Sequence, residues 1–171
     1  MDMKKKQHEL ETSMLFQKWK QHHHDAYLTH FFILNNHEVQ IGYYEPTKDT
    51  MWTFSSSGTF TEDKEIFKEQ KTVPALEMKQ VSVSLEKAKE IADAYYKEKY
   101  SGDTISKEII VLQNLDNKAV YNLTIITMTF KMMNIRIDAL TGEIISQKMQ
   151  SIMDLVQTFE TTKKSSEVKI I

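Results

Sequence analysis

The chain has 171 residues, of which 40% are hydrophobic and 27% charged, so it can form one domain or two small ones with buried cores. Its 22 basic and 24 acidic residues nearly cancel, and Arg136 is its single arginine, so we expect no binding to nucleic acid or anionic membranes. The lack of cysteine excludes disulfides, thiolate catalysis and cysteine-ligated zinc.

The N-terminus carries three consecutive lysines, residues 4–6, followed by a polar stretch over residues 7–12. A secretory signal needs an apolar run of about 7–15 residues after such lysines. No run in the chain approaches the ~18 apolar residues of a membrane-spanning helix. We therefore expect a cytoplasmic protein without a membrane partner.

The first half is predicted as a helix followed by antiparallel strands, in a unit over residues 8–70. Four apolar residues recur at helical spacing and predict an amphipathic helix over residues 8–23: Leu10, Met14, Leu15 and Trp19. Alternation and turn residues predict strands at residues 27–34, 39–43 and 51–55. A polar helix with Thr61 as its N-cap is predicted over residues 61–70.

A second unit is predicted over residues 82–160, after a linker at residues 71–81 that contains Pro74. Ser84 caps the clearest helix of the sequence, whose apolar face is formed by Leu85, Ala88, Ile91, Ala92, Tyr95 and Tyr96. The elements expected after it are strands at residues 108–113, 119–130, 134–139 and 143–147, and a helix at residues 152–159. Residues 161–171 are expected to form a flexible tail.

The two halves share the order of helix and then antiparallel strands, which suggests an internal repeat. When one half is shifted by 84 positions, Val39 meets Leu123, Ile41 meets Ile125, Gly58 meets Gly142 and Phe60 meets Ile144. A curved antiparallel sheet with one apolar face needs a helix to cover it. The alignment predicts that each half supplies one such helix and one such sheet.

Three stretches of the second half stand out: VSLEKAKEIA at residues 83–92, AVYNL at residues 119–123 and IRIDALTGEII at residues 135–145. Together they resemble the PepSY family. The last stretch predicts a hairpin turn shaped by Asp138, Thr141 and Gly142, in which the aspartate binds backbone amides and the glycine supplies a positive φ.

The resemblance covers residues 81–148 and implies an α+β fold of tandem cystatin-like units, each a helix packed on a curved antiparallel sheet. Domains of this type occur in the propeptides of secreted metallopeptidases and in bacterial proteins thought to restrain other proteins. The family is taken to bind or inhibit and not to catalyse, so the resemblance brings no catalytic residues with it.

A run of imidazole and carboxylate groups, His22, His23, His24 and Asp25, offers ligands that suit zinc or nickel. Adjacent residues on a helix diverge by about 100°, however, so three in a row cannot face one ion. We favour a solvated helix end and expect neither a metal nor another cofactor.

Aromatic side chains concentrate in the first half of the chain. Five of them could line a groove for a peptide or a small molecule: Tyr27, Phe31, Tyr44, Trp52 and Phe54. Ordinary core packing is the alternative, and the usual burial of aromatic residues favours it.

No pair of acidic residues has a spacing that indicates acid–base catalysis. The sequence therefore predicts a non-enzymatic protein that binds a protein or peptide and has an inhibitory or regulatory role. Two alternatives stay open at this point. One is a self-assembling structural protein, including a homodimer formed through residues 151–160. The other is a small-molecule binder with an aromatic-lined site between the halves.

Overall fold

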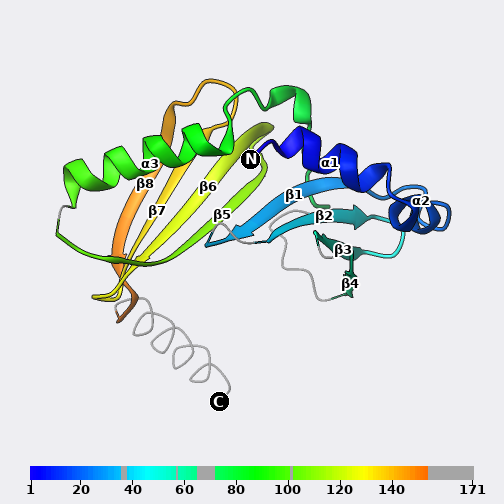
Figure 1. Ribbon diagram of the computed structural model, residues 1–171, viewed down its shortest axis with the longest axis horizontal. Coiled ribbons are helices and arrows are strands. Elements are labelled where there is room, and N and C mark those ends of the chain that lie inside the picture. The colour runs from blue at the N-terminus through cyan, green and yellow to red at the C-terminus, as the bar shows by residue number, and fades with distance from the viewer. Residues whose placement is uncertain (36–37, 57, 65–71, 101, 154–171) are drawn as a thin grey trace, which may run out of the picture.

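A single antiparallel sheet of eight strands runs through the computed structural model, which describes residues 1–35, 38–56, 58–64, 72–100 and 102–153 (Figure 1). The strands are neighbours in the order β4-β3-β2-β1-β5-β6-β7-β8. Their bounds are β1 (Tyr27–Leu34), β2 (Val39–Glu45), β3 (Thr50–Ser55), β4 (Phe60–Asp63), β5 (Ile105–Leu115), β6 (Lys118–Thr127), β7 (Lys131–Asp138) and β8 (Ile144–Ser151).

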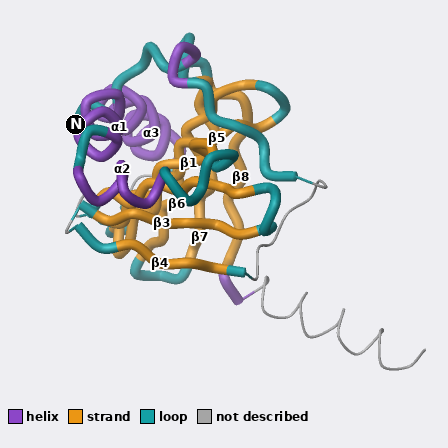
Figure 2. The backbone as a smooth tube through the Cα atoms, turned by 90° about the vertical axis from the view of Figure 1, so that its right-hand side faces the viewer, coloured by secondary structure: helices purple, strands orange, loops and turns teal. Residues whose placement is uncertain are grey.

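The α-helices of the described residues lie on one face of this sheet (Figures 1 and 2). They are α1 (Met3–Glu11), α2 (Met14–Lys20) and α3 (Leu85–Lys99), and a short 3₁₀ helix spans Met78–Gln80. Helices segregated to one face of an antiparallel sheet define the α+β class. The predicted fold class is therefore confirmed at this level.

The strand order is symmetric about the central β1–β5 pair, with β1 to β4 on one side and β5 to β8 on the other. This pair joins Phe31 to Leu112 and Ile33 to Ile110, and all four side chains are at most 1% exposed. α1 and α3 begin close to each other and run toward opposite ends of the sheet (Figure 1). The sheet is thus continuous between the two predicted units.

The helical region at the N-terminus differs from the single helix predicted over residues 8–23. α1 begins at Met3, with the Asp2 carboxylate accepting from the Lys5 amide, and ends at Glu11. Ser13 then caps α2, because its Oγ accepts from the Phe16 amide at 3.2 Å. Hydroxyl side chains compete with the helical backbone bonds, and this chemistry divides the apolar stripe into two short helices.

The core lies between the helices and the covered face of the sheet. α3 buries Ala88 and Ala92 completely, and these small side chains let its backbone approach the strands. Alternate residues of the strands point toward it, as the period of two requires. The fully buried members from β6 and β7 are Leu123, Ile125, Met133, Ile135 and Ile137.

Two further differences from the sequence predictions concern the segment between the halves. Residues 60–63 form the strand β4, because they pair with β3, so the helix predicted from residue 61 is wrong there, and its residues 65–70 lie outside the described part. Within the predicted linker, Leu76 and Val81 are buried, and the Leu76 amide donates to the Leu28 carbonyl at 2.9 Å.

At the C-terminal end, β8 continues through Ser151, and residues 154–171 lie outside the described residues. The helix predicted at residues 152–159 and the tail predicted at residues 161–171 therefore fall almost wholly outside this part. In the portion of the chain that the structure describes, no helix is both long enough and apolar enough to cross a membrane.

Candidate binding surfaces

The five aromatic residues predicted to form a groove are placed on two opposite faces of the sheet. Phe31, Trp52 and Phe54 lie on the face that the helices cover, where the Trp19 ring of α2 contacts the rings of Trp52 and Phe54. Tyr27 and Tyr44 pair across β1 and β2 on the other face, with ring centroids 5.8 Å apart. These side chains therefore do not line one groove.

A buried carboxylate that the sequence analysis missed lies beside this aromatic cluster. Glu45 ends β2 with only 2% of its side chain exposed, and its oxygens accept from His23 Nδ1 at 2.8 Å, Lys48 Nζ at 2.9 Å and Trp52 Nε1 at 3.0 Å. Burial alone would raise the pKa of Glu45, but these hydrogen bonds lower it below its ordinary value. The sequence did not mark Glu45, because the cluster needs His23, which lies 22 positions away, in addition to the nearby Lys48 and Trp52.

The histidine run is not gathered around one point. His23 stacks on Trp19, with centroids 4.7 Å apart, and contacts Glu45, while Asp25 accepts from the Thr47 amide at 3.0 Å. His22 and His24 are exposed. Among the described residues, no group of three or more His, Cys, Asp or Glu side chains is placed to hold a metal ion. The arrangement secures the end of α2 to the β2–β3 hairpin.

The turn between β7 and β8 brings together the three residues that the sequence singled out. Asp138 Oδ1 accepts from the amides of Leu140 and Thr141 at 2.8 and 3.1 Å, and Thr141 Oγ1 accepts from the Glu143 amide. Gly142 adopts a φ of +81° and donates to the Asp138 carbonyl at 2.9 Å. Its Cα faces Ile91 and Val83, so the turn packs against the start of α3.

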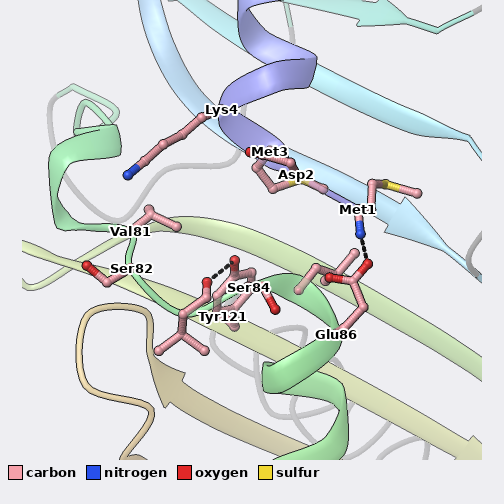
Figure 3. A pocket seen from close by; sticks show the side chains of 11 residues that line it. Met1, Asp2, Met3, Lys4, Val81, Ser82, Ser84, Glu86 and Tyr121 are labelled. Atoms are coloured by element: carbon pink, nitrogen blue, oxygen red, sulfur yellow. Dashed lines mark hydrogen bonds and ion pairs between the residues drawn. The ribbon is translucent and has the colours of Figure 1, made fainter.

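One pocket of ≈360 Å³ lies where the two halves meet on the helix-covered face, between the beginnings of α1 and α3 (Figure 3). The N-terminal ammonium of Met1 forms an ion pair with Glu86 across it, and Tyr121 donates to the Val83 carbonyl. None of the five predicted groove aromatics is among the described residues that line it. The N-terminal ammonium, Glu86 and Tyr121 are therefore already engaged with other groups of this pocket.

β8 forms one outer edge of the sheet among the described strands. It is eight residues long, residues 144–148 are exposed, and Lys148 is its single charged residue. Ile145 is the extra residue of a β-bulge, because Arg136 pairs with Ser146 and Ile137 with Ile144. Beyond the bulge, residues 146–151 pair regularly with β7.

The opposite edge, β4, differs in length and in charge. It has four residues, two of which are Glu62 and Asp63. Short, charged strands are a common protection against unwanted pairing. β8 has less of this protection along its regular part, so it is the edge better suited to receive another strand.

Comparisons with known proteins agree with this architecture. Residues 82–148 match the PepSY model, described as the peptidase propeptide and YPEB domain, and this confirms the resemblance of the second half. The fold is similar to the crystal structure of a "putative lipoprotein" from Clostridium difficile 630, with a TM-score of 0.52 and 13% identity over 78% of this chain and 89% of that one. The comparison with curated proteins found no match.

At 13% identity the neighbour shares the fold, and the description as a lipoprotein belongs to the neighbour. The cytoplasmic location expected for this chain stays a prediction. The family match covers the second half, including most of β8, whereas the Glu45 cluster and the helix break lie in the first half, outside the match.

Proposed function

We propose that this protein is a non-catalytic PepSY-like module that binds an extended segment of a protein partner along β8 and thereby regulates that partner. The observation that carries the proposal is the open edge of β8, of which residues 144–148 lie within the residues matched by the family and residues 149–151 lie beyond them. An exposed edge accepts an added strand through main-chain hydrogen bonds, while alternate side chains provide specificity.

The size of the edge sets the expected affinity. Every second residue of an antiparallel strand directs both its N–H and C=O outward, so residues 146–151 offer about six bonds. At about 1 kcal/mol net for each bond, the backbone alone contributes about 6 kcal/mol, which corresponds to a Kd of about 40 μM before ordering costs. Tighter binding requires side-chain contacts, for which the exposed Ile144 and Ile145 at one end of this segment and the exposed Met153 beyond its other end offer apolar surface.

The test begins with a displayed library of random peptides selected on the full chain. The best peptide is synthesised, and hydrogen exchange of the protein is measured with and without it. We expect the outward-facing amides within residues 146–151 to exchange at least tenfold more slowly with peptide, and those of β4 to remain unchanged. Protection that falls only on other elements would contradict binding at this edge.

A matched pair of N-methylated peptides tests whether backbone bonds hold the complex. Methylation of alternate amides removes donors that face β8, whereas methylation of the other set leaves them intact. We expect the peptide methylated on the amides that face β8 to lose binding and the peptide methylated on the other amides to retain it. Equal binding of both methylated peptides would show that the peptide does not add as a strand.

Self-assembly is a second candidate function, because the same edge could pair with β8 of another copy. Light scattering at increasing protein concentration separates the two functions. A monomer that binds peptide supports the regulatory module, while a dimer that selected peptides cannot dissociate supports self-assembly.

We also propose that the halves are tandem cystatin-like units. The symmetric strand order supports this, as do the equivalent turns at Gly58 and Gly142, whose φ values are +83° and +81°. Superposition of β1–β4 with α1 onto β5–β8 with α3 in an experimental structure tests it. Strands that do not superpose in the same order and direction would refute the repeat.

A further inference from the structure

The break between α1 and α2 leaves a pocket of ≈250 Å³ above β2 and β3, in the half of the chain outside the family match. Because each short helix covers the sheet only in part, a hollow forms in the angle between them. The described residues that line it are Lys6, Glu9, Leu10, Ser13, Leu15, Val39, Ile41, Phe54, Ser55, Ser56 and Gly58.

The floor and walls of this pocket are apolar. Val39, Ile41 and Phe54 form its floor from the strands and are at most 5% exposed. Leu10 and Leu15 come from the two helices and are half-buried, so they retain surface that a ligand can cover. Covering such surface is favourable because it removes apolar area from water.

Polar groups at the rim are already engaged with the protein. Lys6 Nζ lies 3.3 Å from the Glu9 carboxylate, Ser13 Oγ caps α2, and Ser55 Oγ lies 2.8 Å from Thr59 Oγ1. Among the described lining residues the charges of Lys6 and Glu9 compensate each other, and Glu9 also lies 4.0 Å from Lys5 Nζ outside the lining. A charged ligand would lose its hydration without gaining an uncompensated counter-charge, and that loss is costly.

We propose that this pocket binds a small, uncharged, largely apolar molecule. If each methylene-sized group takes up roughly the 30 Å³ of a water molecule, the pocket holds about eight such groups. A neutral eight-carbon chain with one polar head at the rim has this size and charge. The site is separate from the β8 edge and does not depend on the proposed regulatory function.

The test titrates the full chain with 1-octanol, octanoate and octylamine and follows the methyl resonances by NMR. We expect 1-octanol to shift the methyl signals of Leu10, Leu15, Val39 and Ile41, and to bind at least tenfold more tightly than either charged analogue. Shifts spread over other methyl groups, or a charged analogue that binds equally well, would overturn the proposal.

Substitution in the walls provides a second measurement. Leu15→Phe places a larger side chain in the pocket wall, which reduces the free volume and should weaken 1-octanol binding at least tenfold. Leu10→Phe should have the same effect from the other helix. Met14→Phe is the matched control, because Met14 is 73% exposed and outside the lining, and it should leave binding unchanged.

The outcomes remain distinguishable if a variant does not fold. Circular dichroism identifies a variant that does not fold. In that case the methyl shifts of the unmodified chain show whether 1-octanol binds in this pocket. Unchanged octanol binding in a folded Leu15→Phe variant would overturn the proposal, whereas peptide binding at β8 should persist in every folded variant.

Discussion

At the scale of single residues, the chain accommodates two titratable side chains, Glu45 and His30, by different means. Glu45 stays ionised because three donors compensate its burial. His30 instead packs against Gly42, where any Cβ would collide with its ring, and burial lowers the pKa of His30 to about 4. Both residues should therefore affect stability.

Glu45→Gln should lower the free energy of unfolding by about 1–3 kcal/mol, because an amide cannot satisfy all three donors and carries no charge. Chemical denaturation followed by Trp fluorescence measures the change. Glu62→Gln, on the exposed strand β4, is the control and should change stability by less than about 0.5 kcal/mol. Equal effects of the two substitutions would mean that the Glu45 contacts contribute little.

His30 should make stability depend on pH between its unfolded and folded pKa values. The unfolded side chain has a pKa of 6.5, so between pH 6.5 and about 4 the unfolded chain binds a proton that the folded one excludes. The neutral His30 side chain therefore makes its full contribution to the free energy of unfolding above pH 6.5. This contribution falls by about 1–3 kcal/mol as the pH falls toward 4.

Comparison with His30→Phe over the same pH range isolates this effect, because carboxyl groups titrate in both proteins. We expect a shallower pH dependence in the variant. Parallel stability curves for the two proteins would assign the slope to other groups.

At the scale of elements, the connections between helices and strands depend on a few residues with specific backbone geometry. Ser13 divides the N-terminal helical region, and the turn from Asp138 to Gly142 joins β7 to β8 and contacts α3. The first creates the pocket above β2 and β3, and the second positions the beginning of the open edge.

Gly142→Ala should destabilise the protein by about 1–2 kcal/mol, because a φ of +81° is unfavourable for an L-residue with a Cβ. Thermal unfolding monitored by circular dichroism checks this value. Glu143→Ala, at an exposed position next to it, should be close to neutral. A neutral Gly142→Ala would indicate that the turn readily changes its backbone conformation.

At the scale of the whole molecule, the central β1–β5 pair makes one sheet from two symmetric halves. Its buried pairs, Phe31 with Leu112 and Ile33 with Ile110, connect the two sides of the core. Trp19 and Trp52 are both in the first half, so their fluorescence reports on that half alone. This distribution allows a measurement of whether the two halves unfold together.

Leu123→Ala, in β6 of the second half, should lower stability by about 2–5 kcal/mol, because it leaves a cavity at a side chain with no exposed surface. If the halves unfold together, the midpoint measured by Trp fluorescence should fall as much as that measured by circular dichroism. An unchanged fluorescence midpoint would show that the halves unfold independently, as the predicted division into two units allows.

Local patterns in the sequence were sufficient for the class of the fold and for most strands. Alternation and turn residues identified β1 and β2, and Ser84 with its apolar stripe identified α3, because these signals act between near neighbours. The PepSY motif predicted the β7–β8 turn for the same reason, since its hydrogen bonds join residues within five positions.

Long-range contacts decided on which face of the sheet each side chain lies and which surfaces and pockets result. Strand alternation could not show that Tyr44 and Trp52 face opposite sides, because this depends on the pairing of β2 with β3 and on which face the helices cover. The contact of Glu45 with His23, 22 positions away, the pocket at the helix break and the open edge of β8 likewise depend on how the elements pack together. The sequence by itself determined most of the elements and the class of the fold, because those signals are local, whereas tertiary packing decided which surfaces are left exposed.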